Sequence, residues 1–172
     1  MSAIYTRRGD AGTINYRGQN ISKASLFSKV LGCIDELNVM IGWVKTGCSK
    51  ENTKKRLRQI QSTLFDIAAR LTCEKAKREN PSFSSDFQLK IKAMEDEIDL
   101  INEAHEPLKH FLYPGKDDLS VRWHMARVVC RHAERRLVEF SQQHKVSPVI
   151  LAYMNRLSDW FFMKAYEAEK EA

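Results

Sequence analysis

Apolar residues recur at helical spacing along most of the chain after residue 25. In the first such segment, about residues 25–46, the recurring positions are Leu26, Val30, Ile34, Leu37, Ile41 and Val44. A separation of three or four positions places these side chains on one face of an α-helix. Similar stripes predict a second helix over about 51–78 and a third over about 86–106.

Turn-forming residues separate these segments and mark where the last two helices begin. The stretch ENPSFSS at 79–85 is typical of a turn, and Pro114-Gly115 should end any helix before it. A fourth helix is expected from about 118 to 144, with Asp117 or Asp118 as its N-cap. Ser147 and Pro148 then suit the N-cap and first position of a fifth helix that continues to about residue 170.

The predicted helices favour one simple architecture. Several exceed 20 residues, or about 30 Å, and long helices joined by short connections stack antiparallel. We therefore expect an all-α fold in a single domain, residues 1–172. It would consist of an antiparallel bundle of five long helices over 25–170, with the N-terminal segment, 1–24, lying across one end.

Composition narrows the classes of partner and location. The 28 Lys and Arg against 22 Asp and Glu give a net charge of +6, which favours anionic partners without distinguishing nucleotides, nucleic acids and membrane surfaces. No apolar run approaches the ~18–20 residues that span a bilayer, and the N-terminus lacks the apolar region of a secretory signal. A soluble, cytoplasmic protein is expected.

The cysteines also indicate a cytoplasmic protein. Cys33, Cys48, Cys73 and Cys130 are widely scattered, without a C-x-x-C pair or a histidine at metal-ligand spacing. We expect reduced, mostly buried thiols and predict no protein-bound metal centre. Because no convincing Ser-His-Asp or Cys-His set is present, covalent catalysis by a side chain is not expected.

The segment YTRRGDAGTINYRG at 5–18 has a composition found nowhere else in the chain. It gathers glycines, threonines and arginines around Asp10, which suits either a basic tail or a loop that holds an anion with backbone N–H groups. The absence of G-x-x-x-x-G-K-[ST] excludes a P-loop. Lys23 and the carboxylates Asp10 and Glu134 would add charge or hold Mg²⁺.

The fourth helix carries a row of charged residues along one side. The spacing of His124, Arg127, Arg131, Glu134 and Arg135 allows either a solvated face or a binding face. Like charges at i, i+4 weaken an isolated helix by a few tenths of a kcal/mol, a cost that an anionic ligand or opposing carboxylates would remove. Guanidinium groups also suit bidentate contacts to phosphate.

Polar residues interrupt the apolar stretch YMNRLSDWFF at 153–162. Asn155 and Asp159 share a face, and buried polar groups need a partner in the bundle or in a ligand. Asp159 has the alternative of pairing with an arginine of the fourth helix. In the first helix, Asp35 is either a surface charge or the partner of an arginine.

Six segments in sequence order resemble the signatures of one family: YTRRGDAG (5–12), SK (22–23), GCIDELNVMIG (32–42), FLYPG (111–115), CRHAERR (130–136) and YMNRLSDWFF (153–162). The chain is similar to the ATP:cob(I)alamin adenosyltransferase family in its trimeric, five-helix-bundle form. The resemblance implies transfer of the 5′-deoxyadenosyl group of ATP to the cobalt of cob(I)alamin, giving adenosylcobalamin and triphosphate. It also implies Mg²⁺, a homotrimer with sites at subunit interfaces, and no nucleic-acid or membrane partner. A corrinoid reductase and an acceptor enzyme are compatible further partners.

The resemblance also assigns roles to residues. Those implied to bind ATP and its Mg²⁺ are Thr6, Arg7, Arg8, Gly9, Asp10, Gly12, Thr13, Asn15, Lys23, Arg131, Glu134, Arg135 and Asn155. Four residues are implied to serve the reaction: Arg131 on ATP, Phe111 facing the corrinoid, where it keeps a lower axial ligand off cobalt, and Asp35 with Arg127 as a salt bridge.

Several positions depart from the family pattern. Ile14 stands where Ser or Thr is usual, Lys29 replaces a Glu, and Lys116 and His132 replace a common Gly and Arg. Ile14 and Lys29 motivate the alternative of an ATP- or corrinoid-binding carrier with little turnover. A basic helical nucleic-acid-binding protein is a remote alternative, disfavoured because Glu134 shares the arginine face and no aromatic stacking pattern is present.

Overall fold

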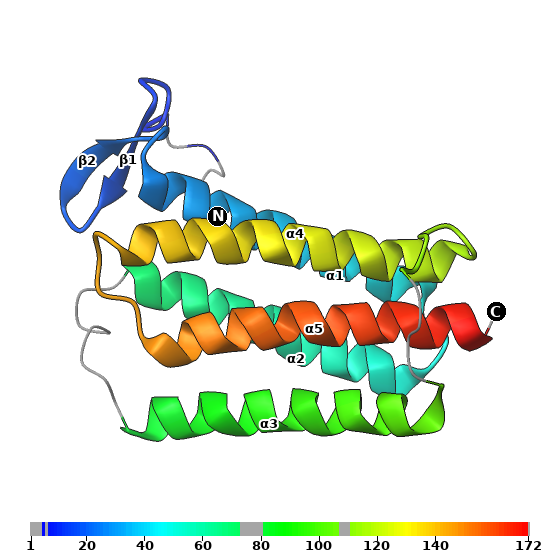
Figure 1. Cartoon of the computed structure of the whole chain (residues 1–172). Coiled ribbons are helices and arrows are strands. Elements are labelled where there is room, and N and C mark those ends of the chain that lie inside the picture. The colour runs from blue at the N-terminus through cyan, green and yellow to red at the C-terminus, as the bar shows by residue number, and fades with distance from the viewer. Residues whose placement is uncertain (1–4, 6, 73–80, 107–110, 172) are drawn as a thin grey trace.

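The computed structural model describes residues 5, 7–72, 81–106 and 111–171. This part of the chain forms five long α-helices and one small antiparallel hairpin (Figure 1). The elements are β1 (Thr13–Tyr16), β2 (Gln19–Ser22), α1 (Leu26–Gly47), α2 (Glu51–Thr72), α3 (Pro81–Ala104), α4 (Asp118–Ser141) and α5 (Pro148–Glu171). The predicted all-α bundle of five helices is confirmed, whereas the hairpin was not predicted.

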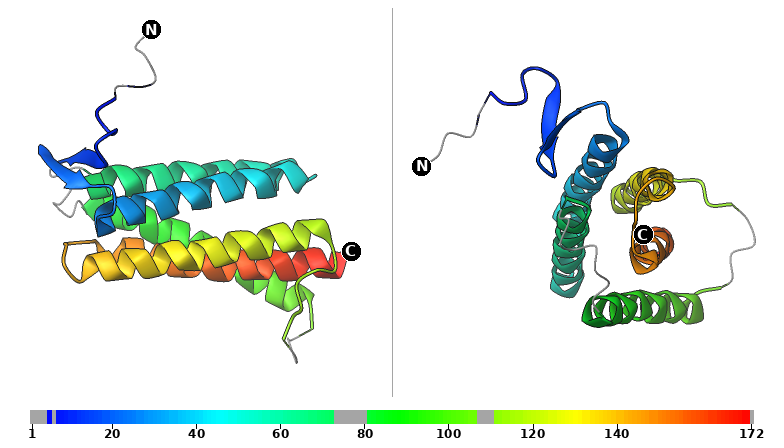
Figure 2. Two further views of the ribbon diagram at one scale, coloured as in Figure 1. Left: turned by 90° about the horizontal axis from the view of Figure 1, so that it is seen from above. Right: turned by 90° about the vertical axis from the view of Figure 1, so that its left-hand side faces the viewer.

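Consecutive helices run in opposite directions along a shared axis (Figure 1). α4 packs against both α1 and α5, α1 also packs against α2, and α3 packs against α5. The N-termini of α1 and α5 and the C-terminus of α4 therefore lie at one end of the bundle, where the hairpin projects (Figure 2). We call this the hairpin end.

Side-chain caps fix where two of the helices begin. Ser25 accepts a hydrogen bond from the backbone amide three residues later, which caps α1. Asp117 caps α4 by accepting from the amides of Leu119 and Ser120 at 2.7 and 3.1 Å. α5 begins at Pro148 as predicted, because the fixed φ and missing N–H of proline suit a first helical turn.

The predicted boundary of the third helix was wrong. α3 begins at Pro81 instead of about residue 86, since the proline that was interpreted as part of a turn occupies the first helical position. The predicted helix over 51–78 is described only as far as Thr72, and its remainder lies outside the described residues. α4 ends at Ser141, slightly before the expected residue 144.

The hairpin joins two four-residue strands through a tight turn. Ile14 pairs with Ile21 in the antiparallel register. Arg17 and Gly18 both have positive φ, 54° and 81°, as the two central residues of a type I′ turn require. The side-chain oxygen of Asn15 accepts a hydrogen bond from the Gly18 amide at 3.2 Å and braces that turn.

Aromatic packing fastens the hairpin to the bundle. The Tyr16 and Phe27 ring centroids lie 3.8 Å apart, and the Phe27 and Phe140 centroids 6.1 Å apart. Arg17 also donates a hydrogen bond to the Leu71 carbonyl of α2. Ile14 is partly buried against the same core, so this departure from the family pattern contributes packing in place of a hydroxyl group.

The bundle interior is apolar and rich in large aromatic residues. Trp123 and Trp160 meet edge to face, with ring centroids 5.5 Å apart. Cys33, Cys48 and Cys130 are free and buried as expected, whereas Cys73 lies outside the described residues. Within the described residues, no helix combines the length and apolar character needed to cross a membrane.

Phe27→Ala should lower the free energy of unfolding by about 3–5 kcal/mol, since it removes the ring that joins the hairpin to α4 and leaves a cavity. Urea denaturation followed by circular dichroism would measure the change. Phe65→Ala is the matched control, because Phe65 is 63% exposed and its removal should change stability by less than about 0.5 kcal/mol. Equal losses in the two variants would contradict the proposed anchoring.

Candidate active site

The segment before the hairpin folds back on itself through two backbone turns. The Asp10 amide donates to the Arg7 carbonyl, and the Gly12 amide donates to the Gly9 carbonyl at 3.1 Å. Arg7 and Gly12 have left-handed φ values of 59° and 72°. Turns that contain a left-handed residue direct N–H groups toward a shared concave surface, as anion-binding loops do, so the conformation suits an anion-holding loop.

Lys23 lies directly against this loop. Its amide donates to the Gly12 carbonyl at 2.8 Å, and a Cβ built on Gly9 would stand 2.8 Å from the Lys23 ammonium nitrogen. A side chain at position 9 would therefore displace the end of the Lys23 side chain from the loop. The exposed side chains of Arg7 and Arg8 bring further positive charge to the same segment.

The predicted charged face of α4 divides into exposed and buried parts. Arg131 and Arg135 are exposed, and neither forms an ion pair or hydrogen bond with another described residue. Glu134 is half-buried, and its Oε1 accepts a hydrogen bond from Asn155 Nδ2 of α5 at 3.0 Å. The bundle thus places two unpaired guanidinium groups beside a carboxylate–amide pair.

His124 lies at the N-terminal end of the charged residues of α4, where it points into the core and is 5% exposed. Its Nε2 lies 3.4 Å from a carboxylate oxygen of the equally buried Glu169. Burial, followed by the positive charge of Arg127, lowers the pKa of His124. Burial and the neighbouring Arg131 also lower the pKa of Arg127. A uniformly solvated face is therefore excluded.

Arg127 and Asp35 do not pair within one chain. Asp35 is exposed on α1, and the Nε of Arg127 is buried without a hydrogen-bond partner among the described residues. The Arg127 guanidinium lies 6.0 Å from the centre of the Phe162 ring. Neither side chain of the predicted salt bridge therefore forms an ion pair with another residue that the structure describes.

The alternative that Asp159 pairs with an arginine of the fourth helix is wrong. Its carboxylate accepts a hydrogen bond from Arg156 NH1 of its own helix at 2.7 Å. Arg156 Nε also donates to Glu95 of α3 at 3.0 Å. Arg156 thereby fastens α5 to α3, whereas Asn155 of the same stretch donates to Glu134 of α4.

The remaining predicted residues are spread along the length of the bundle. The loop and Lys23 lie at the hairpin end, whereas the segment containing Phe111 precedes α4 at the opposite end (Figure 1). Arg131 is thirteen residues beyond Asp118, the first residue of α4, or about 20 Å along the helix axis. Phe111 is 95% exposed, and Thr6 lies outside the described residues.

Within the described residues of a single chain, no hydrogen bond or ion pair joins the loop at 7–12 or Lys23 to the polar residues of α4 and α5. The predicted ATP-binding residues consequently form two groups. One is the loop with Lys23, and the other is Arg131 and Arg135 with the Glu134–Asn155 pair.

Comparison with known proteins identifies the family that carries these two groups of residues. The family model described as cobalamin adenosyltransferase matches residues 4–168. The chain belongs to this family. The match extends over the hairpin and reaches into the last turns of α5, so it includes both groups of predicted ATP-binding residues.

Individual members of the cobalamin adenosyltransferase family give the same result. The corrinoid adenosyltransferase PduO of Salmonella typhimurium is 36% identical over 171 residues, which cover 99% of this chain and 51% of that protein. The chain therefore spans about half the length of the first relatives that it matches. A corrinoid adenosyltransferase of Bacillus subtilis is 32% identical over 169 residues, covering 94% of this chain and 84% of the relative.

Solved structures share the fold. A variant PduO-type ATP:corrinoid adenosyltransferase from Lactobacillus reuteri, complexed with cobalamin and ATP, superposes with a TM-score of 0.84 and 28% identity. The match covers 98% of this chain and 91% of that one. A second variant of the Lactobacillus reuteri enzyme, complexed with ATP, gives the same TM-score.

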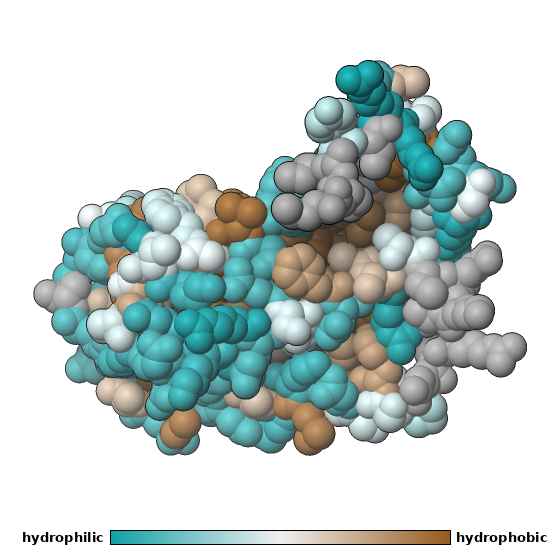
Figure 3. Space-filling model, turned by 180° about the vertical axis from the view of Figure 1, so that it is seen from behind, coloured by the Kyte–Doolittle hydropathy of each residue, from teal (hydrophilic) through white to brown (hydrophobic). Residues whose placement is uncertain are grey.

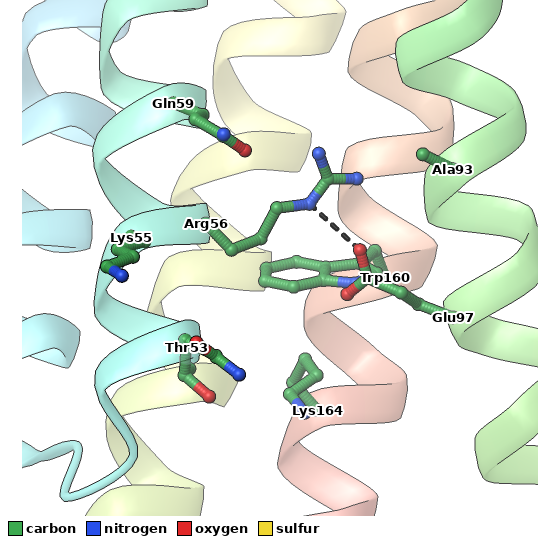
Figure 4. Close-up of a pocket in the computed structure, with 9 residues that line it drawn as sticks. Thr53, Lys55, Arg56, Gln59, Ala93, Glu97, Trp160 and Lys164 are labelled. Carbon is green, nitrogen blue, oxygen red and sulfur yellow. Dashed lines mark hydrogen bonds and ion pairs between the residues drawn. The ribbon is translucent and has the colours of Figure 1, made fainter.

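A cavity of about 440 Å³ between α2, α3 and α5 contains none of the residues predicted for the family's reaction. In this cavity, Arg56 Nε forms an ion pair with the Glu97 carboxylate at 2.9 Å, and the Trp160 indole N–H donates a hydrogen bond to the same carboxylate at 2.8 Å (Figure 4). Glu97 thereby links α3 to α2 and α5. The cavity lies apart from both groups of predicted ATP-binding residues.

A cluster of potential metal ligands was also not predicted from the sequence. Cys33 of α1 and His132 of α4 are 99 positions apart, yet the Cys33 sulfur lies 3.9 Å from each ring nitrogen of His132. Glu36 completes a group whose ligand atoms all lie within 4.8 Å of one another. Only the packing of α1 on α4 brings these residues together, so spacing along the chain gave no signal for them.

The buried His124 should make stability depend on pH. Since its folded-state pKa lies below that of the unfolded chain, the unfolded state takes up more protons as the pH falls through about 6.5. We expect the free energy of unfolding to decrease between about pH 7.5 and pH 5, and His124→Gln to weaken that dependence. Urea denaturation across this range is the measurement. His144→Gln, at an exposed position, is the comparison variant for the same measurement.

Proposed function

We propose that this protein transfers the 5′-deoxyadenosyl group of ATP to the cobalt of a reduced corrinoid and releases triphosphate. The observation that carries the proposal is the near-complete superposition on an enzyme structure that holds both cobalamin and ATP. The turn-rich loop with Lys23 and the unpaired arginines of α4 supply anion-binding groups of the kind this reaction needs.

The reaction requires no attacking side chain. The electron pair of Co(I) forms a bond to C5′ of ATP, the C5′–O bond breaks, and its electron pair leaves on the triphosphate oxygen. The work of the protein is to hold C5′ in line with cobalt and to stabilise negative charge on the leaving group. Both requirements suit a site built from guanidinium, ammonium and backbone N–H groups.

The triphosphate is assigned to the two groups of predicted residues together. The loop at 7–13 and Lys23 would surround the phosphates with N–H donors and an ammonium, while Arg131 and Arg135 would contact them through planar guanidinium groups. Neither arginine has to break an existing ion pair with a described residue to do so. Their mutual repulsion on α4 would then be relieved by the ligand.

Each of the two groups of predicted ATP-binding residues contains a carboxylate suited to coordinate the Mg²⁺ that accompanies ATP. Mg²⁺ prefers oxygen ligands and usually keeps several waters while bridging carboxylates and phosphates. Glu134 Oε1 is oriented by Asn155, and Asp10 is exposed within the loop. We assign these two carboxylates to the ion, which would neutralise charge on the leaving triphosphate.

We further propose a homotrimer whose active sites lie between subunits. The loop and Phe111 lie at opposite ends of one chain, so a site that uses both requires a second copy. Apolar side chains are exposed on the α1 and α4 surfaces: Val39 by 70%, Trp43 by 43%, Met125 by 41% and Val128 by 49%. Apolar surface is also visible beside the N-terminal projection on an otherwise largely polar face (Figure 3).

The unpaired charges of the isolated chain fit the same assembly. Asp35 is exposed, and Arg127 Nε has no hydrogen-bond partner in the part of the chain that the structure describes, so we assign them to a salt bridge that joins neighbouring subunits. Phe111, at 95% exposure, would face the corrinoid and keep a lower axial ligand off cobalt. A cytoplasmic setting, with a reductase to supply Co(I) and an acceptor enzyme for the product, suits the free thiols of this chain.

One assay tests the activity directly. The purified protein would be mixed, without oxygen, with Mg-ATP and chemically reduced cob(I)alamin, and the corrinoid absorbance followed. Formation of adenosylcobalamin with release of triphosphate is expected. ATP binding without any adenosylcobalamin would overturn the proposal and support a carrier that holds nucleotide or corrinoid with little turnover.

Arg131→Ala should lower kcat/KM by at least about 100-fold, because it removes a charge that stabilises the leaving triphosphate. The helix should stay folded, since Arg131 is exposed, and circular dichroism would verify this. Arg136→Ala is the matched control on the same helix, where Arg136 pairs with Glu139 at 2.9 Å. Near-wild-type rates in Arg131→Ala would overturn the assignment of this residue.

A charge exchange tests the salt bridge between subunits. Asp35→Arg or Arg127→Asp alone should shift the protein from trimer to monomer, because each places like charges opposite one another. The double variant should restore the trimer and part of the activity. Sedimentation velocity would measure the assembly state. Failure of the double variant to recover, with both single variants folded, would refute the pairing.

A further inference from the structure

The cluster formed by Cys33, Glu36 and His132 lies outside every role assigned above. It sits where α1 packs against α4, with Cys33 and Glu36 one helical turn apart on α1. The Cys33 sulfur is 3.9 Å from both Nδ1 and Nε2 of His132. With a carboxylate oxygen of Glu36, all three potential ligand atoms lie within 4.8 Å of one another.

These separations are close to those of a tetrahedral metal site. With Zn–S near 2.3 Å and Zn–N near 2.0–2.1 Å, a tetrahedral ion holds its sulfur and nitrogen ligands roughly 3.5 Å apart. The Cys33 sulfur lies 3.9 Å from both Nδ1 and Nε2 of His132, so the imidazole would have to turn about its Cβ–Cγ bond to aim the lone pair of one nitrogen at the ion, with the sulfur and that nitrogen closing by about 0.4 Å. The Glu36 carboxylate would close by roughly 0.5–1.5 Å to complete three ligands, leaving water as the fourth.

We propose that Cys33, Glu36 and His132 bind one divalent transition-metal ion of the Zn²⁺ class. Thiolate and imidazole ligands favour zinc and its neighbours, whereas Mg²⁺ and Ca²⁺ prefer oxygen ligands alone. The site is therefore chemically distinct from one for the Mg²⁺ that accompanies ATP. It does not depend on adenosyl transfer for its existence.

The surroundings of the cluster are suited to this role. Cys33 is 6% exposed, His132 is half-buried and Glu36 is exposed, so a solvated ion would enter past the carboxylate and meet the thiol last. Arg136, a cation whose charge acts on Cys33, is engaged by the Glu139 carboxylate at 2.9 Å. An arginine at position 132, as the family resemblance leads one to expect, would offer no ligand atom to a metal.

A bound ion would tie α1 to α4 one residue away from Arg131. Because the ligands come from two helices, the folded chain would bind the ion much more tightly than the unfolded chain does. The metal should therefore raise the melting temperature in proportion to the logarithm of its concentration above the dissociation constant. This gives a readout that is separate from activity.

Co²⁺ is the spectroscopic probe for the site. The full chain, free of affinity tag, nucleotide and corrinoid, would be titrated with Co²⁺ alone. We expect one equivalent to produce a thiolate-to-cobalt charge-transfer band and the intense visible bands of four-coordinate cobalt, both displaced by Zn²⁺. Absence of these bands, or no rise in melting temperature with Zn²⁺, would overturn the proposal.

Variants assign the ligands. Cys33→Ser should abolish the charge-transfer band, and His132→Gln should weaken Co²⁺ binding at least about 10-fold. Cys48→Ser is the matched control, since Cys48 is also buried beside α1 and its sulfur donates to the Val44 carbonyl; it should keep the full signal. A band that persists in Cys33→Ser, or is lost equally in Cys48→Ser, would refute the assignment. Circular dichroism of each variant would establish that it is folded.

Discussion

The packing of α4 between α1 and α5 is the contact on which the other features of the molecule depend. The middle of the α4 face that makes this contact carries small side chains, with Ala126, Cys130 and Ala133 fully buried, while Trp123 and Phe140 pack toward its two ends. Small residues let the three helices approach closely, and burial of this face leaves the opposite face of α4 to solvent. Arg131 and Arg135 are exposed for that reason, and the Glu134–Asn155 hydrogen bond forms across the same contact.

Features set by local spacing were predictable from the sequence. The starts of α1, α4 and α5 follow from a cap or a proline and from apolar stripes that continue for several turns. Pro81 shows the limit of such reasoning, since proline is compatible both with a turn and with the first turn of a helix. The strands of the hairpin are only four residues long, which is too short for a clear alternation of apolar and polar positions.

Features set by tertiary contact were not predictable in the same way. Asp159 was expected either at a ligand or beside an arginine of α4, but it pairs with Arg156 within its own helix. Lys116 donates a hydrogen bond to the Glu169 carbonyl, a contact near the end of α5 that satisfies a carbonyl group there. The approach of Cys33 to His132 depends on the angle and register of two helices that the chain separates widely.

The order of contacts along the chain also bears on how the molecule folds. α4 and α5 are joined by residues 142–147 alone, so bringing them together has a low closure entropy, which favours their early contact. Contact between α1 and α4 closes a segment of about 70 residues, which carries a larger entropic cost. The hairpin packs on Phe27 of α1 and donates to the Leu71 carbonyl of α2, and Phe27 in turn packs on Phe140 of α4, so the support of the anion-holding loop is complete only after α4 docks on α1. We therefore expect nascent chains to be unable to hold nucleotide until α4 has been synthesised and has docked on α1.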